Sequence, residues 1–161
     1  MNRRCRRPSL ALALLLTSCG YQAGGLMDDL GVRRVAVRVV GNQTFRQRFE
    51  APLTRRILED LSVHSTVAPA SPDRADAVLE VDVRELQGQV LSEGGSLVRE
   101  GALLATVDVR LLRRGDAKVL RQARITDRGE YRVPVGETLA SAEDEVVRDL
   151  ARKVILALDR W

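Results

Sequence analysis

Residues 75–91, ADAVLEVDVRELQGQVL, and residues 103–112, LLATVDVRLL, alternate between apolar and polar side chains. A period of two residues is typical of a strand that buries one face in a core and exposes the other. In the first stretch the alternation slips near residues 84–86, which indicates a bulge or a bend. These two long strands predict that a sheet forms the centre of the fold.

Further strands are predicted on both sides of this pair. Residues 32–40, VRRVAVRVV, alternate in the same way, and residues 119–133 carry polar side chains at every second position. Residues 92–101 contain several glycines and predict a hairpin loop between the two long strands. Gly115-Asp116 predicts the next turn, and residues 63–74, with two prolines, read as a short extended piece followed by a loop.

Two segments show the 3.6-residue period of an amphipathic helix. Residues 136–160 carry a continuous apolar stripe and form the clearest helix of the sequence. An earlier helix is predicted from apolar residues spaced four apart, namely Phe45, Phe49, Leu53, Ile57 and Leu61. Thr44 and Gln47 fit a capping box at its start. Pro52 either kinks this helix or marks a late start near residue 51.

The order strand, helix, strand, strand, strand, helix predicts an α+β fold for residues 32–161. We expect a single mixed or antiparallel sheet of about four strands, with two helices packed on one face. The other sheet face is expected to be polar and charged, because the strands alternate. A chain of 161 residues suits one compact domain of this kind.

The N-terminus predicts export and lipid attachment. Residues 1–18 begin with four arginines, continue with the apolar run LALALLL and end in Thr17-Ser18, which is typical of a secretory signal peptide. The stretch Leu16-Thr17-Ser18-Cys19 resembles a lipobox, where bacterial lipoproteins receive a diacylglyceryl group on the cysteine and are cleaved before it. Cys19 is therefore the expected lipidation site, and residues 19–31 the lipidated tether. Cys5 is lost with the signal peptide, so no internal disulfide is expected.

The net charge of +4 belongs to the signal peptide. Without residues 1–18, the chain has as many basic as acidic side chains, 22 of each. A mature domain without excess positive charge does not indicate a nucleic-acid partner.

The sequence carries no motif for catalysis or metal binding. His64 is the single histidine and lies at the predicted end of the first helix, where a surface position fits best. The sequence has no phosphate-binding loop and no cluster of His, Cys or Asp with ligand spacing. We therefore expect no enzymatic activity, no metal site and no cofactor apart from the covalent lipid on Cys19.

Several of these pieces, in this order, resemble the LptE family of lipopolysaccharide-assembly lipoproteins. The pieces are Cys19-Gly20-Tyr21, the strand of residues 32–40 leading into Asn42-x-Thr44-Phe45, the strand start ADAVLE at 75–80, the strand VDVRL at 107–111 and the charged terminal helix. The resemblance covers nearly the whole mature chain. Pro52 departs from the pattern expected in the first helix.

The resemblance implies a function. LptE-like proteins bind the β-barrel LptD, lie inside its lumen as a plug, assist its assembly and bind lipopolysaccharide. Gly20 after Cys19, in place of aspartate, favours anchoring in the outer membrane. A wide barrel has a polar lumen, and a domain with both positive and negative side chains can form hydrogen bonds with such a lumen. The alternative is a different envelope lipoprotein adaptor, such as a cell-wall synthase activator or an auxiliary subunit of a transporter.

Four arginines are candidates for binding lipopolysaccharide. Arg84, Arg110 and Arg124 fall on outward-facing strand positions, and Arg99 falls in the predicted hairpin loop. The guanidinium group suits the phosphates of lipid A, because it donates paired hydrogen bonds. The simpler interpretation is a polar face that meets solvent or the barrel wall.

Overall fold

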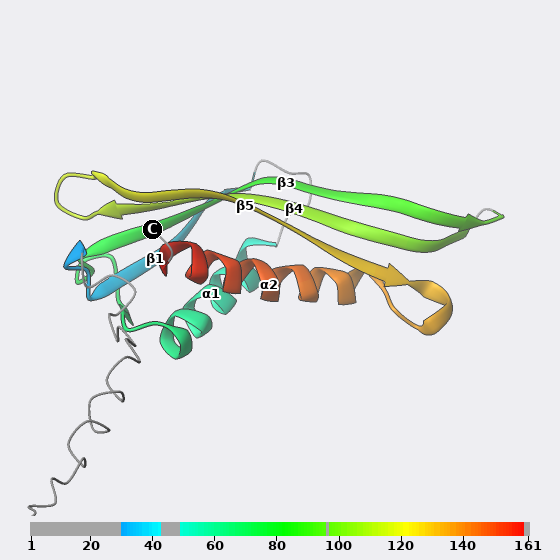
Figure 1. Cartoon of the computed structure of the whole chain (residues 1–161), viewed down its shortest axis with the longest axis horizontal. Helices are drawn as coiled ribbons and strands as arrows, with labels where there is room; N and C mark the ends of the chain where they lie inside the picture. The colour runs from blue at the N-terminus through cyan, green and yellow to red at the C-terminus, as the bar shows by residue number, and fades with distance from the viewer. Residues whose placement is uncertain (1–29, 43–48, 96, 160–161) are drawn as a thin grey trace, which may run out of the picture.

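The computed structural model describes residues 30–42, 49–95 and 97–159. In these residues a five-stranded mixed sheet has the order β2-β1-β3-β4-β5, and both helices cover one of its faces (Figure 1). The elements are β1 (Arg34–Asn42), α1 (Glu50–His64), β2 (Ala68–Pro69), β3 (Ala77–Gly94), β4 (Leu97–Arg113), β5 (Val119–Arg132), the 3-10 turn η2 (Val133–Val135) and α2 (Leu139–Asp159). The predicted α+β fold is confirmed, and the short β2 brings the sheet to five strands.

The sheet is mixed because the chain crosses over once. β1 pairs in parallel with both β2 and β3, whereas β3, β4 and β5 form an antiparallel meander. Parallel neighbours need a connection that returns to the starting end of the sheet, and α1 lies in that connection. α2 then runs back along β5 and β4 and packs beside α1.

The core lies between the helices and the covered sheet face. The predicted stripe of α1 is buried at Phe49, Leu53, Ile57 and Leu61, and Phe45 lies outside the described residues. The buried core side chains of the described part all fall between Val32 and Leu158. They are mostly aliphatic, as expected for a chain with 3% aromatic residues.

α1 begins at Glu50, which confirms the late start allowed by Pro52. Proline is tolerated in the first turn because the backbone N–H that it lacks has no acceptor there. Phe49 is the N-cap residue and makes no side-chain capping hydrogen bond, and the predicted capping box does not lie within the described helix. Its two residues, Thr44 and Gln47, lie outside the described residues.

The loop predicted at residues 92–101 is wrong, because β3 and β4 continue through most of it. Gly94 pairs with Leu97, so the turn is short, and Gly95 adopts a φ of +70° that favours glycine. Two register shifts, after Val90 and after Ser92, interrupt the alternation, so this part of the strand does not show a period of two in the sequence. The bulge predicted near residues 84–86 is confirmed by the register shift between Val83 and Glu85.

Candidate functional site: a charged network on the open sheet face

The sheet face opposite the helices, here called the open face, carries rows of charged residues across neighbouring strands. In one row Glu80 of β3 lies opposite Arg110 of β4. In the next row Asp82 lies opposite Asp108, which lies opposite Arg124 of β5. Side chains of directly paired residues share a face and lie close together, so the register brings these charges into contact.

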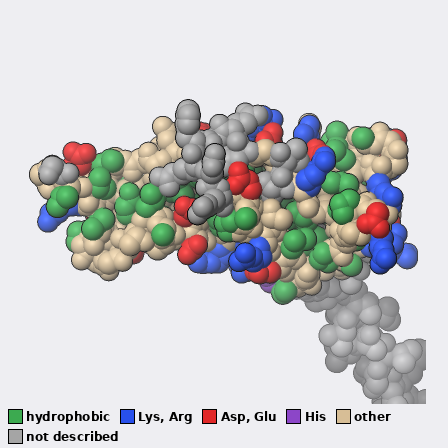
Figure 2. Space-filling view, turned by 180° about the vertical axis from the view of Figure 1, so that it is seen from behind, with side chains coloured by type: hydrophobic (Ala, Val, Ile, Leu, Met, Phe, Trp, Pro, Cys, Tyr) green, Lys and Arg blue, Asp and Glu red, His purple; other side chains and the backbone are tan. Residues whose placement is uncertain are grey.

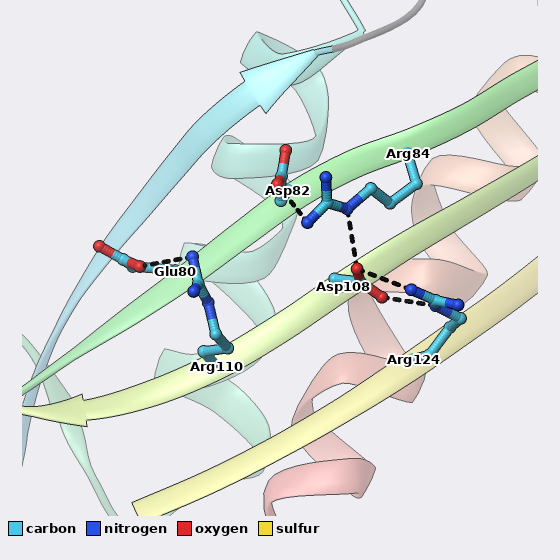
Figure 3. A network of polar contacts seen from close by, with 6 residues as sticks. All are labelled: Glu80, Asp82, Arg84, Asp108, Arg110 and Arg124. Carbon is cyan, nitrogen blue, oxygen red and sulfur yellow. Dashed lines mark hydrogen bonds and ion pairs between the residues drawn. The ribbon is translucent and has the colours of Figure 1, made fainter. Parts of the chain in front are cut away.

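Asp108 is the centre of the network (Figure 3). Its carboxylate accepts hydrogen bonds from Arg124 Nε at 2.7 Å and Arg124 Nη2 at 3.0 Å, and from Arg84 Nε at 2.8 Å. Arg84 sits at the bulge of β3 and also contacts Asp82 Oδ2 through Nη2 at 3.0 Å. Arg84 shares the open face with Asp82, two residues before it, and bridges two carboxylates there.

Glu80 is a second centre. Its carboxylate accepts a hydrogen bond from Arg110 Nη2 at 3.2 Å and is also paired with Arg38 of β1. Only 7% of Glu80 is exposed, so the two guanidinium groups compensate a carboxylate that is almost removed from water. Together the two centres connect β1, β3, β4 and β5 through side chains.

The contact between Asp108 and Arg124 favours the charged form of both groups. The hydrogen bonds from Arg124 and, secondarily, from Arg84 lower the pKa of Asp108 to about 2, although partial burial opposes the shift. The same contact raises the pKa of Arg124. A carboxylate with so low a pKa stays ionised at neutral pH and is a poor acid or base for catalysis.

A shallow depression of about 560 Å³ lies over the network, lined by Arg84, Asp108, Arg110 and Arg124 among others. Each guanidinium has five N–H donors, and Arg124 uses two of its nitrogens on Asp108. The side chain of Arg124 is 70% exposed, so donors remain accessible from solvent. This arrangement suits the binding of an anionic or polar group.

The low pKa of Asp108 predicts a loss of stability in acid. The folded-state pKa of about 2 lies below the ordinary 3.8, so the contribution is complete above about pH 4 and is lost as the pH falls towards 2. Asp108→Asn should therefore lower the free energy of unfolding by up to about 2 kcal/mol at pH 7 and by almost nothing at pH 2. Urea unfolding at the two pH values measures this.

Asp116→Asn is the matched control, because Asp116 is an exposed carboxylate in the β4–β5 turn with a longer contact of 3.6 Å to Arg113. Its variant loses a longer and more exposed ion pair, so it should lower the free energy of unfolding at pH 7 by less than Asp108→Asn does. If Asp108→Asn and Asp116→Asn respond to pH in the same way, the special role of Asp108 is wrong.

The structure brings three of the four candidate arginines together. Arg84, Arg110 and Arg124 border the same depression. Arg99 is not in a loop but in β4, about 30 Å along the strand from Asp108 at ~3.4 Å per residue. A Cβ on Gly94 would lie 2.7 Å from Arg99 Cδ, so the Arg99 side chain lies across the hairpin.

Sequence reasoning did not identify the acidic half of the network. Glu80, Asp82 and Asp108 were visible as outward-facing residues, but nothing in a single strand indicates its partners on the next one. Of the remaining candidates, His64 is exposed at the last residue of α1, as predicted, and Cys19 lies outside the described residues.

Two further observations on the described residues concern metal sites and membrane-spanning helices. In residues 30–42, 49–95 and 97–159, no group of three or more His, Cys, Asp and Glu side chains is placed to hold a metal ion. None of the helices in these ranges has the length and apolar character needed to cross a membrane.

Comparison with known proteins shows where this fold occurs. Lipoprotein B of Nitrosomonas europaea is similar with a TM-score of 0.55 and 15% identity, over 80% of this chain and 83% of that one. A minor lipoprotein of Acinetobacter baumannii has a TM-score of 0.54 and 16% identity, over 79% and 92%. The PelC dodecamer of Paraburkholderia phytofirmans has a TM-score of 0.53 and 17% identity, over 79% and 86%. At these identities the likeness shows the fold alone.

No curated protein matches this sequence. A family model does match it. The model described as "LptE: Lipopolysaccharide-assembly" matches residues 32–158, which is almost all of the described domain. The chain therefore belongs to the LptE family, a non-enzymatic family of lipopolysaccharide-assembly lipoproteins.

Proposed function

We propose that this chain is an outer-membrane lipoprotein that binds an LptD-like β-barrel, fills its lumen and assists both the assembly of the barrel and the insertion of lipopolysaccharide. Lipid on Cys19 holds it on the periplasmic face of that membrane. The observation that carries the proposal, beyond family membership, is the charged network of the open face. It presents hydrogen-bonding groups from β1, β3, β4 and β5 on the sheet face opposite the two described helices.

The network suits a polar wall better than an apolar one. The side chains of Arg84, Arg110 and Arg124 are 39%, 47% and 70% exposed, so a partner that covers this face removes charged groups from water. Such burial is unfavourable unless new hydrogen bonds replace those to water. The lumen of an outer-membrane barrel is lined with polar side chains that provide them.

The same network is the proposed contact for lipopolysaccharide. It contains four arginines and three carboxylates, namely Arg38, Arg84, Arg110, Arg124, Glu80, Asp82 and Asp108. The excess of positive charge and the accessible guanidinium donors favour a phosphate group, which accepts charge-assisted hydrogen bonds. Arg99 lies too far away to contact the same phosphate, and a role for it needs a second contact near the hairpin.

Affinity purification from membranes tests this function. The unsubstituted chain should co-purify with a large outer-membrane barrel and with lipopolysaccharide, identified by mass. The double variant Arg84→Gln, Arg124→Gln should lose at least about tenfold in bound lipopolysaccharide per barrel recovered, since each charge-assisted contact contributes about 1.5–3 kcal/mol before rearrangement.

The control is Arg55→Gln, Arg148→Gln, which makes the same change of charge on exposed positions of α1 and α2. It should retain both barrel and lipopolysaccharide. Equal lipopolysaccharide recovery with the two double variants would exclude the open face as the lipid contact. Recovery of a cell-wall synthase or a transporter in place of a barrel would instead establish the alternative, an adaptor of another envelope machine.

A further inference from the structure

Charge is segregated along the long axis of the domain. One end, here called the entry end, consists of residues 30–34, 70–76 and 113–118, where the described chain begins and β4 turns into β5. Its basic side chains are Arg33, Arg34, Arg74, Arg113, Arg114 and Lys118, and its acidic ones are Asp73, Asp76 and Asp116. Figure 2 shows Lys and Arg side chains at this end, on the right of the view.

The opposite end has the reverse balance. Residues 90–100 and 130–137 contain four glutamates and two arginines, and they expose apolar side chains. The exposed apolar residues are Val90, Leu91, Leu97, Val133 and Val135. A mature chain with equal numbers of basic and acidic residues therefore has a positive end and a negative end.

The entry end is one continuous surface. The Asp76 carboxylate accepts hydrogen bonds from the backbone N–H groups of Arg33 and Arg34, at 3.2 and 2.9 Å. The Asp76 backbone carbonyl accepts one from the Arg114 N–H at 3.1 Å. A hollow of about 570 Å³ lies between these segments and is lined by Leu30, Gly31, Asp76, Arg113 and Arg114, among others.

Each acidic residue of the entry end forms an ion pair with an arginine of the same surface. Asp76 pairs with Arg34 at 2.8 Å, Asp116 with Arg113 at 3.6 Å and Asp73 with Arg74 at 3.8 Å, in the last two cases at exposed positions. Arg33, Arg114 and Lys118 are then in excess, and all three are exposed. The entry end therefore presents net positive charge to whatever lies next to it.

The position of the proposed anchor identifies that neighbour. Ten residues lie between Cys19 and Leu30, and the eleven steps from one to the other span at most about 40 Å. β4 alone, with 17 residues, extends over about 55 Å. When the entry end faces the membrane, the negative end therefore lies far from the anchor.

We infer that the entry end is a membrane-contacting surface that binds the headgroups of anionic phospholipids, with Arg33, Arg114 and Lys118 supplying the attraction. The orientation rests on the proposed lipidation of Cys19. In the absence of the barrel, contact with the headgroups sets the long axis of the domain away from the leaflet surface and directs its negative, apolar end away from the lipid. A lipid anchor alone limits the distance between the domain and the membrane and does not set the orientation of the domain.

Vesicle binding tests the surface without the anchor. The probe is residues 19–161 with Cys19→Ser, a chain that retains every core side chain of the described domain. It should sediment with vesicles that contain phosphatidylglycerol and not with pure phosphatidylcholine vesicles. Raising the salt concentration from 0.05 to 0.5 M should release it, because the contacts are exposed and therefore screened.

The triple variant Arg33→Gln, Arg114→Gln, Lys118→Gln should bind anionic vesicles on the order of 100-fold more weakly, given about fivefold per basic residue at such a surface. The control Arg128→Gln, Arg132→Gln, Arg148→Gln removes three exposed basic residues outside the entry end and should bind like the unsubstituted probe. Thermal unfolding checks that both variants are folded. Absence of binding by the probe, or equal losses in both triple variants, overturns the inference. Neither result bears on the barrel, which the assay does not contain.

Discussion

Cys19→Ser is expected to abolish lipid attachment and cleavage of the precursor completely. The thiol of Cys19 is the group that accepts the diacylglyceryl chain in a lipobox, and a serine hydroxyl is a far weaker nucleophile. Each methylene of an acyl chain contributes about 0.8 kcal/mol to membrane binding, so several chains form an effectively permanent anchor. Intact-mass measurement should show acyl mass on a chain that begins at residue 19, and none on the variant.

Cys5→Ser provides the matched control, since Cys5 lies in the segment that is predicted to be removed. Its mature product should have the same mass as that of the unsubstituted chain. If residues 1–18 are exchanged for an ordinary cleavable signal peptide, the Cys19→Ser chain should move from the membrane to the soluble periplasmic fraction. Barrel assembly should then decline, because the anchor no longer raises the local concentration of the domain. An unsubstituted product that begins at Met1 without acyl mass would contradict the anchor.

Gly129→Ala should cause a large loss of stability for so small a substitution. Gly129 of β5 lies directly under the first turns of α2, and a Cβ there would be 2.6 Å from the Ala142 carbonyl oxygen and 2.9 Å from Val146 Cγ2. The helix cannot easily yield, because Val146 and Leu150 are fully buried. We expect the free energy of unfolding to fall by about 1–3 kcal/mol, as for overpacked cores.

Gly115→Ala is the control for this prediction. Gly115 lies in the β4–β5 turn, and a Cβ there has no atom within 4 Å. This change should be neutral or stabilise slightly, because alanine restricts the unfolded chain more than glycine does. Urea unfolding of both variants measures the difference, and a stable Gly129→Ala chain would show that α2 is not seated on β5 as described.

The sequence was sufficient for the elements but not for their pairing. The stripe Phe49, Leu53, Ile57 was visible, because helical period is a property of one segment. The hairpin was missed, because two register shifts near Ser92 break the period on which a strand prediction depends. The sequence therefore predicts Arg99 in a loop and as a candidate beside Arg84, whereas the structure places Arg99 in β4, far from the charged network.

The charged network illustrates the same limit. Arg84, Arg110 and Arg124 were correctly placed on the outward face from alternation alone. Their carboxylate partners could not be predicted, because opposition of Asp108 to Arg124 depends on a register that is set across two strands. The bulge was expected near Arg84, but the contact of Arg84 with Asp108 on the next strand was not.

The sequence by itself determined the α+β class, the apolar faces and the equal numbers of positive and negative charges in residues 19–161, and it predicts the targeting segment and lipidation of Cys19. These are properties of composition and of local period, which can be read along one segment at a time. Only the tertiary structure decided which arginine meets which carboxylate and how charge divides between the two ends. Those depend on strand register and on loops distant in sequence, such as residues 30–34 and 113–118, which only the folded sheet brings together.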